Sequence, residues 1–259
     1  MSSRKEVKVR RPSLFWLLTE TGRAVTELGI NYTYQWWNQP KAKGDSHPVL
    51  VLPGFMASAQ STLVLRKFID KIGYTAYDWD IGRNYGKVEY LDQLLEQVDA
   101  LYNKHQQKVS LIGWSLGGVY ARQLAKERPD IIRQIIMMGT PFQAIRDANH
   151  AVWIHKLINF GKEEQPVDED FLASIPAPAP VPSTSIYSKQ DGVVPWAACL
   201  ETEEGLYRQN IQVRSSHLGF GVNPAVYAII ADRLQLTRQN WQHFQHNGKL
   251  QNLLFYPSA

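Results

Sequence analysis

The sequence has a single cysteine, Cys199, and this scarcity excludes several classes of protein. One thiol cannot form an intramolecular disulfide framework, and it cannot build a multi-cysteine metal site. A near-absence of cysteine also favours a reducing compartment. We therefore expect a cytoplasmic protein with no bound metal.

Long apolar runs are also missing. The run Leu14–Leu18 is five residues long, shorter than the apolar core of a secretory signal, and Thr19 and Glu20 follow it at once. No stretch has the length of unbroken apolar sequence that spans a bilayer. We expect neither a signal peptide nor a transmembrane segment.

Excess charge is confined to one end of the chain. The whole net charge of +4 is accounted for by the N-terminal residues Arg4, Lys5, Lys8, Arg10 and Arg11, set against Glu6. The remainder is neutral, which argues against a nucleic-acid surface. The basic tail has two interpretations: a frayed end, or a weak peripheral contact with anionic lipid worth about 1 kcal/mol per basic residue.

The rest of the sequence alternates short apolar runs with helical periodicity, the pattern of an α/β domain. The apolar runs predict strands at residues 49–52, 74–79, 109–112, 131–138, 185–187 and 211–213. Helical spacing predicts helices at residues 60–72 and 88–106, after residue 115, and at 224–234. A length of 259 residues suits one domain. We expect a mostly parallel sheet with helices on both faces and ligand sites at the carboxyl ends of its strands.

Residues 1–47 precede this pattern as a basic tail, a helix and a linker. Pro12 and Ser13 indicate the start of a helix whose apolar face ends before Gly29 and comprises Leu14, Leu17, Leu18, Thr21, Val25 and Leu28. We expect this face to pack on the body of the protein, and a helix lying on a membrane is the alternative. The aromatic segment 31–37 fits either an edge strand or an extension of the helix.

Residues 142–184 interrupt the alternation between the two parts of the core, 48–141 and 185–259. They contain an apolar helix candidate at 152–160, an acidic patch, and prolines at every second position from Pro176 to Pro182, which favour a stiff extended return. We expect a helical cap over the carboxyl edge of the sheet. Its apolar side chains Trp153, Leu157 and Phe160 would then face the site, and an external decoration is the alternative.

The motif Gly113-Trp114-Ser115-Leu116-Gly117 joins a predicted strand to a predicted helix. A G-x-S-x-G sequence in that context is typical of a sharp, strained turn that exposes a nucleophilic serine at a helix N-terminus. The alternative is a glycine-rich turn in which Ser115 only caps the helix. If the motif is functional, a base and an orienting acid must follow it in the chain.

His217 is the best candidate for the base, because it follows the last predicted strand in a loop rich in serine and glycine. His243 and His246 fall in a polar tail, and His47, His105, His150 and His155 come too early in the chain. Asp191 just follows the preceding strand and is the candidate acid. An ordinary Asp-Gly turn is its alternative interpretation, and Glu201, Glu203 and Glu204 are the fallback acids.

An oxyanion needs two backbone N–H donors. Leu116, directly after the candidate nucleophile, supplies one. The loop after the first predicted strand, Pro53-Gly54-Phe55-Met56, should supply the other, with Phe55 preferred and Met56 as the alternative.

Together these segments resemble the α/β-hydrolase superfamily and, within it, the bacterial serine esterases and lipases. The matching pieces are Leu52–Phe55, Gly113–Gly118, Met138–Pro141, Asp191–Pro195 and Ser216–Gly219. The resemblance implies Ser115 as nucleophile, Asp191 as acid, His217 as base, and Phe55 and Leu116 as oxyanion donors. Two departures stand out: Pro53-Gly54 replaces the common His-Gly opening, and residues 1–47 contain no clear antiparallel strand pair. The sheet is therefore expected to be shortened, with the N-terminal helix covering its edge.

These observations predict a cofactor-free hydrolase that cleaves a small-molecule ester or lipid through an acyl-enzyme. Its substrate pocket is expected to include Met56, Trp114, Trp153, Leu157, Phe160 and Leu218. A thioesterase, an acyltransferase or a cofactor-free haloperoxidase can use the same residues. A ligand-binding protein that kept the fold without catalysis is the alternative from a different class.

Overall fold

A computed structural model describes residues 9–37, 44–143, 169–246 and 256–257. Its sheet has six parallel strands in the order β2-β1-β3-β4-β5-β6. The strands are β1 (Pro48–Leu52), β2 (Thr75–Asp78), β3 (Val109–Trp114), β4 (Ile132–Met138), β5 (Ser183–Tyr187) and β6 (Arg208–Gln212). Each of the six overlaps a predicted strand, so the predicted parallel sheet is confirmed. The last strand begins earlier than predicted, because the polar residues Arg208–Asn210 pair with β5 at the edge of the sheet and give no apolar signal.

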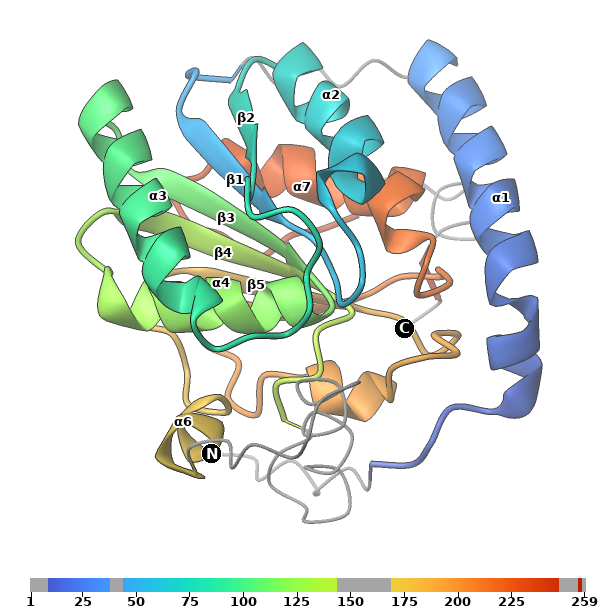
Figure 1. Ribbon diagram of the computed structural model, residues 1–259. Coiled ribbons are helices and arrows are strands. Elements are labelled where there is room, and N and C mark those ends of the chain that lie inside the picture. Colours follow the sequence, from blue (N-terminus) through green and yellow to red (C-terminus); the bar gives the residue numbers. More distant parts are fainter. Residues whose placement is uncertain (1–8, 38–43, 144–168, 247–255, 258–259) are drawn as a thin grey trace.

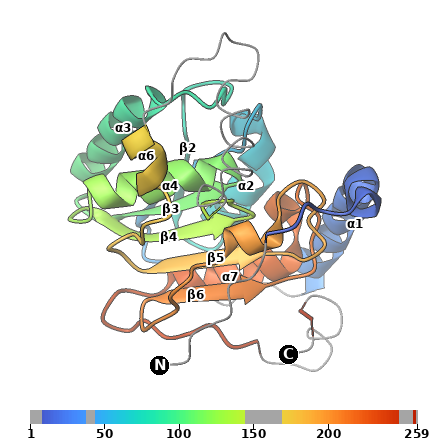
Figure 2. The same ribbon diagram turned by 90° about the horizontal axis from the view of Figure 1, so that it is seen from below.

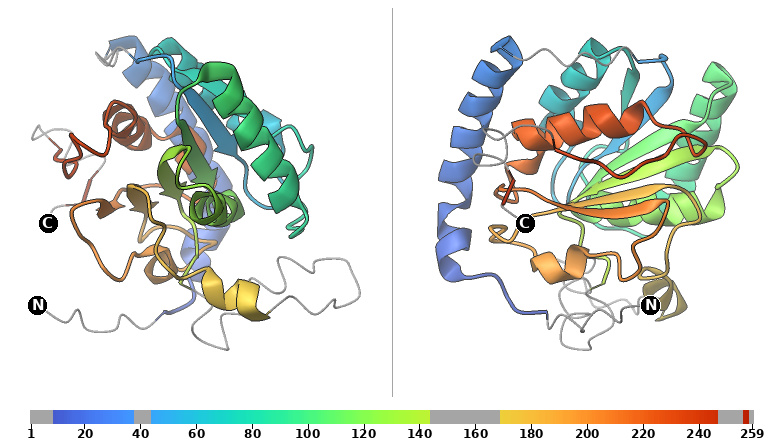
Figure 3. Two further views of the ribbon diagram at one scale, coloured as in Figure 1. Left: turned by 90° about the vertical axis from the view of Figure 1, so that its left-hand side faces the viewer. Right: turned by 180° about the vertical axis from the view of Figure 1, so that it is seen from behind.

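Helices cover both faces of this sheet, as predicted (Figure 1). The α-helices are α1 (Leu14–Trp37), α2 (Leu63–Lys71), α3 (Tyr90–His105), α4 (Leu116–Glu127), α6 (Glu169–Ser174) and α7 (Pro224–Leu234). Short 3-10 helices are η1 (Ala59–Thr62), η2 (Trp196–Cys199) and η3 (Phe220–Val222). Helices α3 and α4 cover one face, and α2 and α7 cover the other, which faces the viewer in the right-hand view of Figure 3.

The central strands are apolar on both sides because each side meets a helix layer. Leu50 and Leu111 point into the core under α3 and α4, whereas Val51 and Ile112 point into the core under α2 and α7. A strand buried on both faces reads as a continuous apolar run rather than an alternating one, which is why these strands could be recognised in the sequence.

Helix α1 begins where Pro12 and Ser13 predicted, with the Ser13 hydroxyl accepting the Trp16 N–H at 3.4 Å. The predicted end at Gly29 is wrong, because the helix continues to Trp37 and resolves the open segment 31–37 as helix. Asn31 is buried and bonds to Tyr227 of α7, so a tertiary contact outweighs the low helix propensity of Gly29.

The orientation of α1 also differs from the prediction. Its apolar stripe faces away from the protein: Leu14, Leu18 and Val25 are 73%, 83% and 66% exposed. The opposite face, which carries Glu20 and Asn31, is buried. The helix does not cover an edge of the sheet. It packs on α7 and η3 and reaches the loops that leave the carboxyl ends of β5 and β6, as Figure 2 shows.

The return from the insertion is held by one buried side chain of α4. The Arg122 guanidinium donates to the carbonyls of Ile175, Pro176 and Ala177 at 2.9–3.1 Å, and it forms a buried ion pair with Glu201. This network fixes residues 175–177 against the core. The predicted cap helix, with Trp153, Leu157 and Phe160, lies outside the described residues.

Among the helices of the described residues, none combines the length and the apolar character needed to cross a membrane.

Candidate active site

Ser115 lies in the turn between β3 and α4 with a φ of 53° and a ψ of −121°. A non-glycine residue with positive φ is strained, and this strain is typical of the turn that the sequence motif predicts. The flanking glycines leave no room for a side chain. A Cβ on Gly113 would lie 2.3 Å from the Gly118 backbone, and one on Gly117 would lie 2.2 Å from the Leu52 carbonyl oxygen. The motif is therefore a required feature of this turn rather than a coincidence of composition.

Asp191 and His217 meet across the ends of β5 and β6. The Asp191 Oδ2 atom lies 2.7 Å from His217 Nδ1, and both side chains are buried. The other carboxylate oxygen, Oδ1, accepts the N–H groups of Val193 and Val194 at 2.8 and 2.7 Å. This turn fixes the carboxylate, and the carboxylate in turn orients the imidazole so that Nε2 is left for other chemistry.

The electrostatic surroundings favour a proton on His217. Burial by itself lowers the pKa of an imidazole, but the charge and hydrogen bond of Asp191 and the charge of Glu20 outweigh burial. The pKa of His217 is therefore raised above its ordinary value of 6.5. A base of this kind holds a proton well once it has received one.

The serine turn and the histidine loop are tied together by Trp114. Trp114 directly precedes Ser115, and its indole N–H donates to the His217 carbonyl at 3.1 Å. Gly139, at the end of β4 with a φ of 55°, lies beneath the same loop, where a Cβ would be 3.2 Å from His217 Nδ1. These contacts hold Ser115, Asp191 and His217 at one end of the sheet.

The loop after β1 approaches the same place. A Cβ on Gly54 would lie 3.3 Å from the Ser115 Cβ, so this loop borders the candidate nucleophile. The Met56 N–H donates to the Asn84 carbonyl at 2.7 Å, and Asn84 Nδ2 donates to the Pro53 carbonyl at 2.9 Å. The engaged Met56 N–H argues against Met56 as the loop's oxyanion donor, and Leu116 stands at the first position of α4.

Two of the three fallback acids have other partners. Glu201 is buried and paired with Arg122, and the Glu204 carboxylate accepts the Asn210 N–H at 2.9 Å. Glu203 is exposed to solvent. The tail histidines are also exposed: His243 bonds to the Gly205 carbonyl, and His246 stacks on Tyr256.

A second serine–histidine–aspartate group lies at the opposite end of the sheet. His47 Nε2 is 2.8 Å from Ser110 Oγ, and His47 Nδ1 pairs with Asp45. Ser110 is the second residue of β3 and is fully buried between the paired strands β1 and β4, so no substrate carbonyl can reach it. Burial and the nearby charge of Arg133 lower the pKa of His47 to about 4, so this group is structural at neutral pH.

The expected pocket residues have different positions. Met56 and Leu218 are exposed on the two loops that flank Ser115, whereas Trp114 is buried beneath the His217 loop. Trp153, Leu157 and Phe160 lie outside the described residues. Cys199 is buried, and burial raises the pKa of its thiol, so it does not compete with Ser115 as a nucleophile. In the part of the chain that the structure describes, no three His, Cys, Asp or Glu side chains gather in a group that could hold a metal ion.

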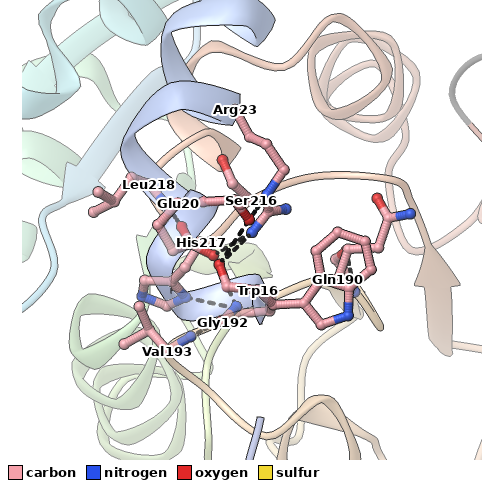
Figure 4. Close-up of polar contacts among 12 residues, drawn as sticks. Trp16, Glu20, Arg23, Gln190, Gly192, Val193, Ser216, His217 and Leu218 are labelled. Carbon is pink, nitrogen blue, oxygen red and sulfur yellow. Dashed lines mark hydrogen bonds and ion pairs between the residues drawn. The ribbon is translucent and has the colours of Figure 1, made fainter. Parts of the chain in front are cut away.

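Sequence analysis missed two carboxylates of α1 that contact the site loops. Glu20 accepts the N–H groups of Gly192 and Leu218, the residues directly after Asp191 and His217 (Figure 4). Glu27 accepts the Ser216 N–H at 2.7 Å and the Ser215 hydroxyl at 2.6 Å. The available signal was the spacing of Glu20, Glu27 and Asn31, which share one face of a helix whose other face is apolar.

Comparison with known sequences gives partial matches. A family model described as lecithin:cholesterol acyltransferase matches residues 69–153. The human protein "Serine hydrolase BPHL" is 30% identical over 130 residues, which cover 46% of this chain and 43% of that protein. The chain thus matches less than half the length of this curated relative.

Comparison with solved structures covers more of the chain. A metagenome-derived lipolytic enzyme superposes with a TM-score of 0.55 at 16% identity, over 74% of this chain and 93% of that one. A monoacylglycerol lipase from Paleococcus ferrophilus gives a TM-score of 0.55 at 12% identity, over 74% and 95% of the two chains. At such identities the likeness establishes the fold, which agrees with the six-stranded parallel sheet described above.

Proposed function

We propose that this α/β-hydrolase cleaves carboxylic esters through an acyl-enzyme formed on Ser115. The observation that carries the proposal is the Asp191–His217 pair at the end of the sheet where Ser115 lies in its strained turn. The Trp114 indole links that pair to the turn. The similarity to a serine hydrolase and to lipolytic folds supports hydrolysis as the reaction class.

In this mechanism His217 Nε2 accepts the Ser115 hydroxyl proton while Oγ attacks the ester carbonyl carbon. The oxyanion that forms is stabilised by the N–H of Leu116 at the α4 N-terminus and by that of Phe55. His217 then gives its proton to the leaving alcohol oxygen, and the acyl-enzyme remains. Water, deprotonated by His217, attacks the acyl carbon and restores the Ser115 hydroxyl with release of the acid.

The raised pKa of His217 suits this cycle. The imidazolium must persist long enough to protonate the alkoxide leaving group, and the negative charge of Asp191 stabilises it for that interval. Asp191 contributes orientation and negative charge.

An acyl transfer to an acceptor other than water is the second candidate, because residues 69–153 match a family model described as an acyltransferase. Both reactions share the acyl-enzyme and differ in what attacks it. Thioester cleavage uses the same steps with a thiolate leaving group, and a non-catalytic role lacks the acyl-enzyme altogether.

A panel of nitrophenyl esters and acyl thioesters of graded chain length distinguishes these functions. Ester hydrolysis predicts turnover of the esters with release of free acid in water alone. Turnover that requires an added alcohol acceptor would indicate acyl transfer, and turnover confined to thioesters would indicate a thioesterase. No reaction with any member of the panel, and no labelling by a fluorophosphonate, would contradict the proposed chemistry.

A further inference from the structure

Helix α1 joins the two loops that carry Asp191 and His217. Glu20 Oε1 accepts the Gly192 N–H at 2.7 Å, and Oε2 accepts the Leu218 N–H at 3.1 Å. Each donor is the residue directly after Asp191 or His217. One carboxylate therefore connects the backbone of the acid loop to the backbone of the base loop, as Figure 4 shows.

This carboxylate is held rigidly. Glu20 is only 4% exposed, and Arg23 Nη2 donates to its Oε1 at 2.9 Å. Arg23 is itself fixed, because it also donates to the Trp16 carbonyl and lies over the Trp16 ring. The fit against the acid loop is close: a Cβ on Gly192 would lie 2.4 Å from the Leu17 backbone nitrogen.

The buried Glu20 carboxylate accepts two backbone N–H groups and one guanidinium hydrogen bond, so both of its oxygens have hydrogen-bond partners. An apolar residue at position 20 would leave the N–H groups of Gly192 and Leu218 without this partner. The face of α1 that carries Glu20 and Glu27 therefore contacts the site loops. The apolar face lies on the opposite side of the helix and is turned outward for this reason.

We infer that Glu20 is a positioning residue for the Asp191–His217 pair. It sets the spacing of the two loops, and its charge stabilises the imidazolium of His217. The inference rests on the proposed function for its kinetic consequence, but the geometry of the pair can be measured without any substrate.

The groups around His217 decide its protonation. Asp191 and Glu20 carry the charges that raise its pKa, and burial opposes them. Glu27 contacts the backbone of Ser216 in the same loop, and Arg23 partly neutralises Glu20. The Glu20→Gln substitution removes one negative charge and one acceptor oxygen while it keeps the shape of the side chain.

The test combines kinetics with NMR titration of His217 in Glu20→Gln, with Glu203→Gln as the matched control at an exposed carboxylate. In Glu20→Gln we expect kcat to fall by about tenfold to a hundredfold, as for a small displacement of a catalytic group, while KM changes less than about threefold. The pKa of His217 should fall, and the acidic limb of the rate profile should move to lower pH. Arg23→Gln should move that limb in the opposite direction.

A His217 titration and a kcat in Glu20→Gln that match those of Glu203→Gln would overturn the inference. Circular dichroism and thermal unfolding check that the variant is folded. If it is not folded, Arg23→Gln alone still decides, because an unchanged or lowered His217 pKa in that variant contradicts the inference. If the wild-type protein hydrolyses no ester, the proposed function fails, but the NMR titration still tests the role of Glu20.

A second inference rests on the opposite face of α1. Four exposed side chains lie on one stripe of the helix: Leu14, Leu18, Val25 and Tyr32. Counted from Leu14, the other three follow after 4, 11 and 18 positions, which places all four on the same side of the helix. Both carboxylates of the helix point inward, so this outer stripe carries no negative charge. Directly before the helix, Arg10 and Arg11 are exposed, and the sequence places Arg4, Lys5 and Lys8 ahead of them.

An apolar stripe without acidic residues, next to a basic segment, is complementary to an anionic lipid surface. We propose that α1 docks on such a surface with its apolar stripe in the interface and Arg10 and Arg11 against the headgroups. The loops of Gly192 and Leu218 contact the other side of the same helix, so docking would place these loops directly behind the membrane-bound helix.

Sedimentation with vesicles tests this docking on the full chain. Vesicles of phosphatidylcholine with phosphatidylglycerol should bind the protein at low salt, and vesicles of phosphatidylcholine alone should bind it much less. Leu18→Ser should weaken binding on the order of tenfold, and the double change Arg10→Gln and Arg11→Gln should remove most of its salt dependence. Leu206→Ser, at another exposed leucine, which lies between β5 and β6, is the control and should bind like the wild type.

Failure of the wild type to bind the anionic vesicles would overturn the docking proposal. Binding that Leu18→Ser leaves unchanged would do so as well. A dimer in solution that Leu18→Ser dissociates would show instead that the stripe pairs with a second copy of the chain.

Discussion

Asp191 Oδ2 lies 2.7 Å from His217 Nδ1, although the two residues leave different strands and stand 26 positions apart. The parallel order of β5 and β6 makes this contact possible, because both strands deliver their following loops to the same end of the sheet.

Replacing Asp191 by asparagine should lower turnover steeply while the protein stays folded. The amide can no longer hold the imidazole in the required tautomer, and a comparable change in another serine enzyme lowers kcat by about 10⁴. Steady-state rates with a short nitrophenyl ester measure the effect. Glu203→Gln should match the wild type, and a collapse of activity in that control instead would mean that the acid is misassigned.

The rate should depend on pH through His217. The base must be neutral to accept the Ser115 proton, and the pKa of His217 is raised above 6.5 by Asp191 and Glu20. Activity is therefore lost as pH falls through this raised pKa, and the acidic limb of kcat/KM should lie above pH 6.5. An acidic limb of kcat/KM at or below pH 6.5, the ordinary pKa of histidine, would contradict the raised pKa of His217.

His47 should make the protein less stable in acid. Burial and Arg133 lower its pKa to about 4 in the folded state, from 6.5 in the unfolded chain. Between these values the unfolded chain binds the extra proton, so the free energy of unfolding falls as pH falls from about 6.5 to about 4. Urea unfolding across this window should show a loss on the order of 3 kcal/mol. His47→Gln should flatten this dependence, and an unchanged slope in that variant would rule out His47 as its source.

The predicted cap helix should influence substrate preference. Trp153 and Leu157 are four positions apart on an apolar face, and covering the site would bury that face. Trp153→Ala or Leu157→Ala should therefore change the preferred acyl length more than it changes turnover of the smallest ester. Equal losses across all chain lengths would indicate that the segment only supports the fold.

The turn and the strands at the Ser115 end of the sheet could be anticipated from the sequence because their signals are local. The strained turn at Ser115 needs glycines at fixed positions, and buried parallel strands read as apolar runs. The order of serine, acid and histidine along the chain then singled out Asp191 and His217. The turn and the strands are each recognised from residues that are close together in the sequence, whereas the choice of Asp191 and His217 uses only their order along the chain.

The position of α1 could not be anticipated in the same way. Periodicity identifies an amphipathic helix but does not say which face meets the protein, and the usual assumption places the apolar face inward. Here the buried face is the one with Glu20 and Asn31, because backbone N–H groups of two distant loops require acceptors there. Glu20, which in the sequence only ends the apolar run 14–18, thus contacts both site loops, more than 170 positions away in the chain.

Trapping of the acyl-enzyme tests the central claim most directly. The protein is mixed with nitrophenyl acetate, quenched in acid within the first turnover, and digested for peptide mass spectrometry. The account predicts an acetyl group on Ser115 in the wild type and none in Ser115→Ala, which should fold normally yet lose ester turnover. A Ser115→Ala variant with activity within tenfold of the wild type, or an acyl group found on another residue, would contradict it.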